Sequence, residues 1–220
     1  MKRVRTDDGS VTFYNSKFGE AYHSTSGAVE EAFEKFVRPS KIADFVKKKK
    51  TIKLLDICFG LGYNSAAFID EVLNHNADCK IFITALENDE EILKEALRLN
   101  TTFASFDMIQ RLIKSQKRDL CKLDLARVKI KLYVKDALRS IKAISNKFDF
   151  VFLDPFSPKK CPELWTEEFF KDIYKLMNKK GVLTTYSCAR SVRDNLKAAG
   201  FKVEDGPSVG RRSPSTIAYR

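Results

Sequence analysis

The stretch that decides the fold is LLDICFGLGYN, Leu54–Asn64. It predicts an apolar strand that ends at Asp56, a glycine-bearing loop, and a helix that begins near Asn64. Gly60 and Gly62 carry no Cβ, so the loop backbone is free to approach a ligand closely. The N–H groups at a helix start seat a carboxylate, and Asp56 is placed to pair with an amino group. The stretch therefore suits an amino-acid moiety, which carries both groups.

From Thr51 onward, apolar runs alternate with helical stretches. The predicted strands are Ile52–Ile57, Ile81–Leu86, Ile130–Val134, Phe148–Leu153, Val182–Thr185, Phe201–Glu204 and Thr216–Tyr219. The predicted helices are Ser65–Leu73, Glu90–Leu99, Phe106–Lys114, Ala137–Ile144, Glu167–Met177 and Ala189–Ala199. Strands joined by helices predict an α/β, Rossmann-like fold with a mostly parallel seven-stranded sheet. The last two strands have no helix between them and predict an antiparallel edge pair.

The sequence predicts one domain over residues 1–220, with a Rossmann-like core at 51–220 and an N-terminal extension at 1–46. In the extension, two short strands flank Asp8-Gly9, a dipeptide suited to a hairpin turn. A helix is predicted at Ser24–Phe36.

Composition limits the classes of function. The net charge of +11 indicates a polyanionic partner such as a nucleic acid, although a solvated lysine-rich surface is the alternative. No apolar run approaches the roughly 20 residues that a membrane helix needs, and the start lacks a signal peptide, so we expect a cytoplasmic protein. The 5 cysteines are scattered without C-x-x-C spacing, which disfavours a disulfide framework or a metal centre. The sequence does not indicate the oligomeric state.

Acidic residues follow successive predicted strands. Glu87 ends the second, where a carboxylate accepts hydrogen bonds from ribose hydroxyls, and Asp136 follows the third, with Ala137 where an adenine edge is read. Each alone is also explained as an exposed carboxylate or a helix N-cap. Open α/β sheets bind ligands at the carboxyl ends of their strands, so three such acids together favour a ligand site.

This arrangement resembles a class I S-adenosylmethionine-dependent methyltransferase. The first motif of that family is commonly D-x-G-x-G-x-G, and here Cys58 replaces its first glycine. A dinucleotide-binding enzyme would show G-x-G-x-x-G, and this chain has Ser65 in place of the third glycine.

The loop after the fourth strand predicts the reacting group. Pro155 and Pro158 stiffen the backbone and hold Asp154 beside Phe156. An acid next to an aromatic ring suits a flat base, or an amine delivered to a donor methyl group. We expect Asp154 to orient the amine and accept its proton, because burial raises the basicity of a carboxylate. A plain proline-rich turn is the alternative, and Trp165 has a packing role as its simplest explanation.

Several stretches resemble the methyltransferase part of the bacterial MnmC family over nearly the whole chain. Asp56–Asn64 follows D-x-G-F-G-T-G-x-N except at Cys58 and Leu61. Asp154–Trp165 follows D-A-F-S/A-P-x-x-x-P-x-L-W with a proline in place of the alanine. The G-x-x-x-K/R-R stretch near the end of the family domain resembles Gly206–Arg212.

The resemblance implies S-adenosylmethionine as cofactor and tRNA as partner, bound at the anticodon loop. The reaction implied is N-methylation of 5-aminomethyluridine, or its 2-thio form, at the wobble position. Some family members carry an FAD-dependent oxidase domain that first exposes the amine, and we expect none here. The candidate cofactor-binding residues are Asp56, Phe59, Gly60, Gly62, Asn64, Glu87, Asp136, Ala137 and Asp154. The candidate substrate-binding residues are Tyr22, His23, Glu30, Pro155, Phe156, Arg211 and Arg212.

Other functions stay open at this point. Pro155 makes the loop resemble D-P-P-Y/F of enzymes that methylate exocyclic base amines of RNA or DNA. A catalytically inactive RNA-binding module would keep the fold and the charge. An aminopropyltransferase or a small-molecule methyltransferase is a further reading, although the cationic surface disfavours polyamine substrates.

Overall fold

The computed structural model describes residues 1–210 and 212–220. The strands are β1 (Lys2–Arg5), β2 (Val11–Asn15), β3 (Glu20–Ala21), β4 (Thr51–Ile57), β5 (Lys80–Glu87), β6 (Leu120–Asp124), β7 (Val128–Val134), β8 (Phe148–Leu153), β9 (Met177–Thr185), β10 (Lys202–Asp205) and β11 (Thr216–Tyr219). The helices are α1 (Ala28–Glu31), the π-helix η1 (Ala32–Val37), α2 (Ile42–Val46), α3 (Tyr63–His75), α4 (Glu90–Ala96), α5 (Phe106–Lys114), α6 (Ala137–Ser140), the 3-10 turns η2 (Ile141–Ala143) and η3 (Pro162–Trp165), α7 (Glu167–Leu176) and α8 (Arg190–Ala198). No helix in this described part of the chain is long and apolar enough to cross a membrane.

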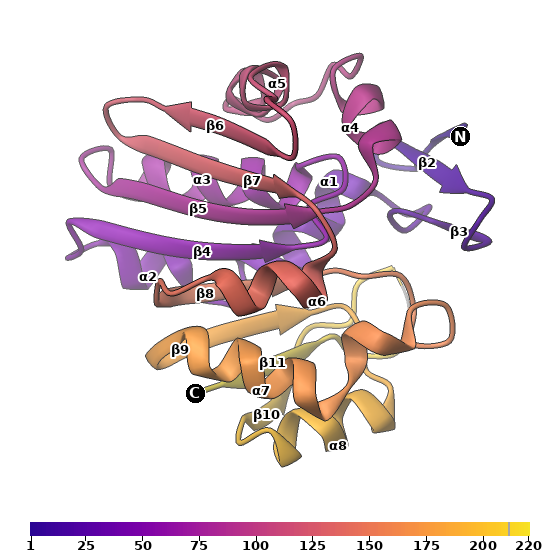
Figure 1. Ribbon diagram of the computed structural model, residues 1–220, viewed down its shortest axis with the longest axis vertical. Coiled ribbons are helices and arrows are strands. Elements are labelled where there is room, and N and C mark those ends of the chain that lie inside the picture. Colours follow the sequence, from indigo (N-terminus) through magenta and orange to yellow (C-terminus); the bar gives the residue numbers. More distant parts are fainter. Residues whose placement is uncertain (211) are drawn as a thin grey trace.

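The main sheet has eight strands in the order β10-β11-β9-β8-β4-β5-β7-β6 (Figure 1). Its five central strands, β9 to β7 in that order, run parallel, which confirms the predicted α/β class. The last two strands, β10 and β11, form the predicted antiparallel edge pair. The carboxyl ends of the parallel strands therefore meet at one edge of the sheet, where the predicted acids lie.

The predicted number of seven strands is wrong, because β6 adds an eighth at the other edge. It pairs antiparallel with β7. Its sequence, LCKLD, buries only alternate residues, since Cys121 and Leu123 face the core while Lys122 and Asp124 face solvent. So short an edge strand gives a weak apolar signal in the sequence.

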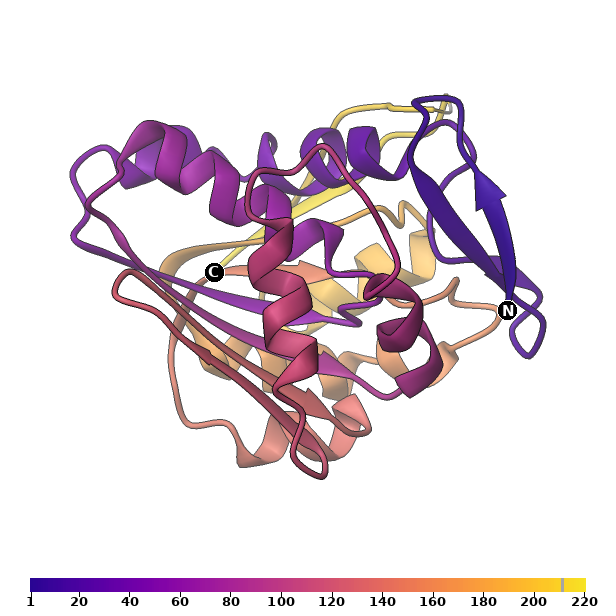
Figure 2. The ribbon, with the colours of Figure 1, turned by 90° about the horizontal axis from the view of Figure 1, so that it is seen from above.

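The core is split by the sheet into two layers. Leu54 and Phe152 pack into one apolar cluster with α3 and α5, and their neighbours Leu55 and Leu153 pack into a second cluster with α7 and α8. Successive side chains of a strand point to opposite faces, so a strand with helices on both sides is apolar throughout. Figures 1 and 2 show the two helical layers on either side of the sheet.

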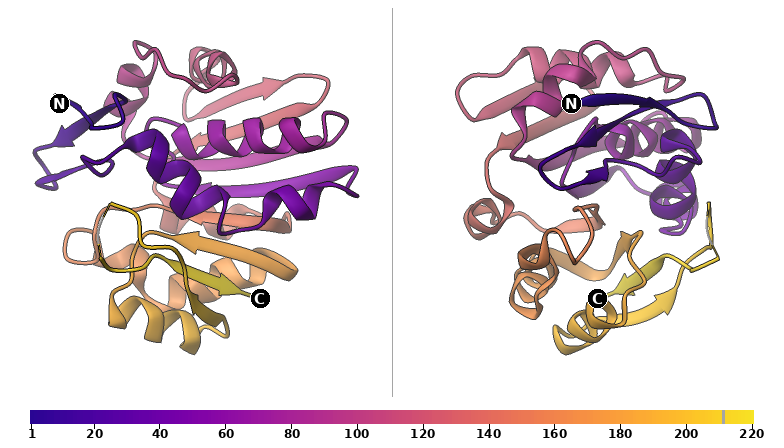
Figure 3. Two further views of the ribbon diagram at one scale, coloured as in Figure 1. Left: turned by 180° about the vertical axis from the view of Figure 1, so that it is seen from behind. Right: turned by 90° about the vertical axis from the view of Figure 1, so that its right-hand side faces the viewer.

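The N-terminal segment folds over the carboxyl edge of this sheet. Strands β1, β2 and β3 form a small antiparallel sheet, and the expected hairpin turns at Gly9, whose φ is +82°. Figure 3 shows this sheet beyond the tips of the central strands. The helix expected at Ser24–Phe36 begins only at Ala28 and continues as the π-helix η1. Both helical pieces pack beside α3.

Candidate functional site

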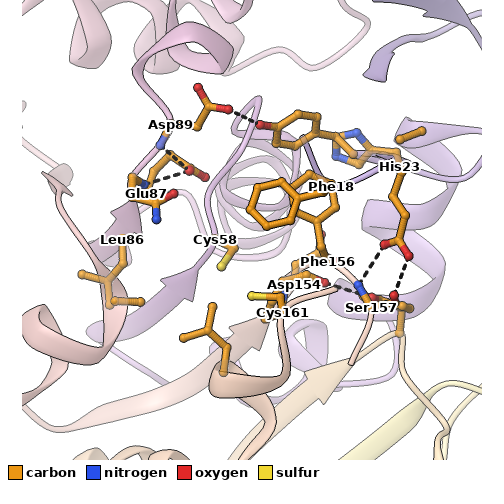
Figure 4. Close-up of a pocket in the computed structure, with 18 of the residues that line it drawn as sticks. Phe18, His23, Cys58, Leu86, Glu87, Asp89, Asp154, Phe156, Ser157 and Cys161 are labelled. Carbon is orange, nitrogen blue, oxygen red and sulfur yellow. Dashed lines mark hydrogen bonds between the residues drawn. The ribbon is translucent and has the colours of Figure 1, made fainter. Parts of the chain in front are cut away.

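A cavity of about 560 Å³ lies between the carboxyl ends of β5, β7 and β8 and the N-terminal segment. Figure 4 shows Glu87 on one side of it and Asp154 with Phe156 on the other, with Cys58 between them. Ligand sites of parallel α/β sheets lie at this edge, and their volumes fall in about this range.

The structure divides the predicted site residues into two groups. Those that line the cavity are Tyr22, His23, Glu87, Asp136, Ala137, Asp154, Pro155 and Phe156. Those that do not are Asp56, Phe59, Gly60, Gly62, Asn64, Glu30 and Arg212. Arg211 lies outside the described residues.

Glu87, at the end of β5, connects the glycine loop to the cavity. One carboxylate oxygen accepts a hydrogen bond from Gly60 N at 2.7 Å, and the other accepts from the N–H groups of Asn88 and Asp89 at 2.8 and 2.9 Å. Burial raises the pKa of this carboxyl. An ionised carboxylate accepts about four hydrogen bonds, so one further acceptor site remains for a hydroxyl.

Asp136 and Ala137 line the cavity next to Glu87 along the sheet edge. The Asp136 side chain accepts a hydrogen bond from Arg139 N and so caps helix α6. The geometry gives Asp136 both a cap and a place on the cavity wall.

Asp56 lies behind the cavity rather than in it. The side chain has no exposed surface, and one oxygen accepts a hydrogen bond from Ser65 Oγ at 2.6 Å while the other has no partner among the described residues. Burial raises its pKa to about 7. Asp56 therefore does not form part of the cavity wall itself.

Backbone conformation and side-chain packing explain why the loop has glycine at positions 60 and 62. Gly60 and Gly62 have φ of +54° and +82°, and a Cβ on Gly62 would lie 2.6 Å from Ile109 Cγ2 and 2.7 Å from Phe59 Cζ. Cys58 stands at the first glycine of the family motif and also has a left-handed φ, +65°. The turn thus survives with cysteine, as expected. Gly62 is required by packing rather than by a ligand, because a Cβ at this position would point into the side chains of Ile109 and Phe59.

Cys58 also lines the cavity, together with Cys161. Burial raises the pKa of Cys58 well above its ordinary value and that of Cys161 to about 12. None of the five cysteines forms a disulfide in the described part of the chain.

Asp154 leaves the end of β8 as predicted and faces the cavity. Its Oδ2 accepts a hydrogen bond from Asn64 Nδ2 at 2.9 Å, so Asn64 is held to this carboxylate rather than to the cavity. Burial, followed by repulsion from Glu31, raises the pKa of Asp154 well above its ordinary value. The loop is fixed from behind, because Tyr186 Oη donates to Pro155 O at 2.9 Å and Trp165 Nε1 donates to Phe156 O at 2.9 Å.

Residues of the N-terminal segment that the sequence did not single out complete the wall. Phe18 stacks on Phe156 with ring centroids 4.4 Å apart. Both oxygens of Glu20 accept hydrogen bonds from Ser157, one from its N–H at 2.9 Å. Nothing in the sequence marks these residues, because their partners lie more than a hundred positions away.

Tyr22 and Asp89 join the two walls at another point. Tyr22 Oη donates to Asp89 Oδ2 at 2.6 Å, and its ring edge meets Phe156 at 4.9 Å between centroids. Tyr22 also covers Gly60, since a Cβ there would lie 3.5 Å from the Tyr22 ring. Tyr22, a predicted substrate-binding residue, is therefore also a contact between the N-terminal segment and the glycine loop.

Two predicted substrate-binding residues, Glu30 and His23, lie differently in the structure. Glu30 is exposed and faces away from the cavity, whereas the next residue, Glu31, lines it with Lys35. His23 lines the cavity but is buried against Thr12, whose hydroxyl lies 3.1 Å from Nδ1. Burial lowers the pKa of His23 to about 4, well below the ordinary value of an imidazole.

These groups suit S-adenosylmethionine. Glu87 offers an acceptor to ribose hydroxyls, and Ala137 offers a small apolar contact beside it. Glu31 and Lys35, which are buried and line the same cavity, offer one charge of each sign. No group of three metal-ligating side chains occurs in residues 1–210 and 212–220.

Known proteins match this chain closely. A family profile described as S-adenosyl-L-methionine-dependent methyltransferase matches residues 100–220. The crystal structure of MnmC2 from Aquifex aeolicus superposes with a TM-score of 0.84 at 34% identity, over 99% of this chain and 69% of that one. The chain belongs to this methyltransferase family. The structural class and the cofactor expected from the sequence are thereby confirmed.

Two curated relatives are longer than this methyltransferase. An uncharacterized protein of Methanocaldococcus jannaschii is 36% identical over 219 residues, which is 99% of this chain and 59% of that protein. The tRNA 5-methylaminomethyl-2-thiouridine biosynthesis bifunctional protein MnmC of Leptospira interrogans is 28% identical over 222 residues, 94% of this chain and 34% of that protein. The methyltransferase thus spans about a third of the bifunctional relative.

Proposed function

We propose that this methyltransferase N-methylates the primary amine of 5-aminomethyluridine, or its 2-thio form, at the wobble position of tRNA. The leptospiral relative is named for the biosynthesis of 5-methylaminomethyl-2-thiouridine in tRNA, and the similarity extends over 94% of this chain. The observation that carries the proposal is Asp154, a carboxylate with a raised pKa beside an aromatic pair on the cavity wall.

The chemistry needs a proton acceptor close to the amine. S-adenosylmethionine supplies an electrophilic methyl group on sulfur, whose C–S electron pair stays with the sulfur when the methyl group leaves. As the amine nitrogen forms its bond to the methyl carbon, one N–H proton passes to Asp154. Asn64 orients the carboxylate through Nδ2, and the raised pKa makes Asp154 a better base than an exposed aspartate. Positioning supplies much of the remaining rate.

Aromatic and basic groups at the cavity suit an RNA loop. We propose that Phe18 or Phe156 stacks on the target base, because single-stranded RNA is bound by such stacking. Lys17, Lys159 and Lys160 are exposed on the two loops that carry these rings. Their charges favour phosphates, and Arg212, with the neighbouring Arg211, would extend the contact to an anticodon loop. Residues 1–46 and the Rossmann-like core would then act as one unit, in the cytoplasm.

The roles of the cofactor residues are also proposals. Glu87 binds the ribose, and Asp136 with Ala137 binds the adenine edge. Asp56, Phe59, Gly60, Gly62 and Asn64 act indirectly, by holding the loop and Asp154 in place.

The direct test is a methyl-transfer assay. The enzyme is incubated with S-adenosylmethionine labelled in its methyl group and tRNA that carries 5-aminomethyluridine, followed by mass analysis of the nucleosides. We expect label only in 5-methylaminomethyluridine, and none with tRNA that lacks the amine. Labelled adenine or cytosine would favour methylation of an exocyclic base amine instead. Donor binding without any transfer to RNA would favour an inactive RNA-binding module.

Asp154→Ala and Asp154→Asn separate the base from its position. Both variants should lower kcat by about a hundredfold or more while S-adenosylmethionine binding, measured by calorimetry, changes little. Activity of the parent should fall as the pH drops through the raised pKa of Asp154, because the carboxylate form is required. Parental turnover by Asp154→Asn would show that the residue only orients the amine.

A further inference from the structure

An ion pair is buried in the cavity wall, close enough to Asp154 for both of its charges to affect the pKa of that residue. Glu31 and Lys35 have exposed fractions of 7% and 4%, and Lys35 Nζ lies 2.7 Å from Glu31 Oε1. Both side chains line the cavity. Every other ion pair of residues 1–210 and 212–220 has at least one side chain that is more than a third exposed. The Glu31–Lys35 pair is therefore distinct in its surroundings.

Burial of two charges costs more free energy than a surface pair, and their attraction offsets it only when further hydrogen bonds are made. Lys35 has three N–H donors and uses one, in its bond to Glu31. Glu31 accepts a second bond from Ser24 N at 2.7 Å, so one oxygen is tied to the chain and the other to Lys35. Two ammonium donors on the cavity wall are thus left for a ligand.

The place of the pair along the sheet edge fits one end of the donor. The order of strands is β7, β5, β4 and β8, so Asp136, Glu87, Cys58 and Asp154 follow one another along the edge. With the adenine of S-adenosylmethionine at Asp136 and its ribose at Glu87, the sulfur atom would lie over β4, near Asp154. The amino-acid end must then extend toward α1 and η1, which pack against α3 and carry the pair.

We propose that Glu31 and Lys35 bind the zwitterionic amino-acid end of S-adenosylmethionine. Lys35 Nζ donates to the carboxylate, and Glu31 holds Lys35 in place and accepts from the ammonium group. A pair of opposite charges complements a zwitterion without a net change of charge in the cavity. The assignment takes the place of the one expected for Asp56, which is fully buried and does not line the cavity, and it rests on the donor site but not on the identity of the RNA.

The test compares two ligands that differ only in the carboxylate. Calorimetry without RNA measures the Kd of S-adenosylmethionine and of decarboxylated S-adenosylmethionine for the parent, for Lys35→Met and for Glu31→Gln/Lys35→Met. The double variant removes both charges and leaves no unpaired buried carboxylate, so it keeps the fold if the single variant does not. Lys171→Met is the matched control, because Lys171 forms an exposed i,i+4 pair with Glu167 at 2.6 Å. Thermal unfolding checks each variant.

We expect the parent and Lys171→Met to prefer S-adenosylmethionine by about tenfold or more, the value of a charge-assisted hydrogen bond in a buried site. Both cavity variants should lose most of that preference, with a Kd for the decarboxylated ligand within about threefold of the parental value. Equal affinity of the parent for the two ligands, or an undiminished preference in the variants, would overturn the proposal. No binding of either ligand to the parent would instead remove the donor site itself.

Discussion

At the scale of the residue, the buried carboxyl of Asp56, beside the glycine loop, makes the stability of the fold depend on pH. Its pKa rises from 3.8 to about 7 on folding, so the native state keeps a proton that the unfolded chain releases. Between those two pH values the unfolded state binds fewer protons than the folded state, so the free energy of unfolding falls as the pH rises. Above about pH 7 neither state holds this proton, and the contribution of Asp56 no longer changes with pH. Asp56→Asn removes this titration. We expect Asp56→Asn to be more stable relative to the parent at pH 8 than at pH 4, with a larger difference in the free energy of unfolding (variant minus parent) at pH 8.

Urea unfolding across that range measures the effect, and the exposed Asp107→Asn serves as the control. Parallel pH profiles for the parent and Asp56→Asn would contradict the raised pKa.

Gly60 and Gly62 form a matched pair for a second prediction. Both have positive φ, but a Cβ at 60 meets nothing closer than 3.5 Å, whereas one at 62 would lie 2.6 Å from Ile109. Gly60→Ala should therefore cost about 1 to 2 kcal/mol from backbone strain alone. Gly62→Ala should cost about 1 to 3 kcal/mol more, because overpacking adds to that strain. Equal destabilisation of the two variants in urea would remove packing as the reason for Gly62.

At the scale of the element, the contact between the N-terminal segment and α4 governs how firmly the cavity is closed. Tyr22 Oη donates to Asp89, the N-cap of α4. Tyr22→Phe deletes that donor and should speed amide hydrogen exchange across residues 20–23, with faster dissociation of S-adenosylmethionine and little change in global stability. Tyr14→Phe, whose ring is 40% exposed, is the control. Unchanged exchange in Tyr22→Phe would show that other contacts hold the segment, such as Asn15 with Asp89 and Glu20 with Ser157.

Long apolar elements were predictable, and short ones were not. The strand Phe148–Leu153 and the helix Phe106–Lys114 have the predicted bounds, because a buried strand and an amphipathic helix each leave a clear period in the sequence. The strands β3 and β6 are short or half exposed, so tertiary pairing rather than local pattern defines them. The π-helical turns of η1 likewise have no sequence period of their own.

At the scale of the whole molecule, charge near the cavity should govern RNA binding. Lys159 and Lys160 follow the Asp154 loop, whereas Lys48 and Lys50 precede β4 at the opposite edge of the sheet. Alanine at 159 and 160 should weaken tRNA binding and reduce the slope of log K against log salt by about 1 to 2, without changing the affinity for S-adenosylmethionine. Alanine at 48 and 50 should leave that slope unchanged. The reverse pattern in filter-binding titrations would place the RNA on the other edge.

The residues of one cavity wall were predictable from the sequence. Glu87, Asp136 and Asp154 follow parallel strands, and topology alone brings strand ends together. The other wall comes from Phe18, Glu20 and Lys35, whose positions depend on how the N-terminal segment folds back, which no local pattern encodes. Likewise, Glu31 rather than the predicted Glu30 lines the cavity, because the fold of α1 decides which of two neighbouring acids faces inward.

Two thiols line a cavity built for an electrophile. Sulfur is a strong acceptor of methyl groups, but the thiolate rather than the thiol is the nucleophile. Because burial keeps the pKa of Cys58 and Cys161 far above neutrality, both remain protonated beside the reactive methyl group. The enzyme is thereby protected against alkylating itself. A cysteine in the glycine position of the loop is compatible with this chemistry only as long as water and cations stay away from its sulfur.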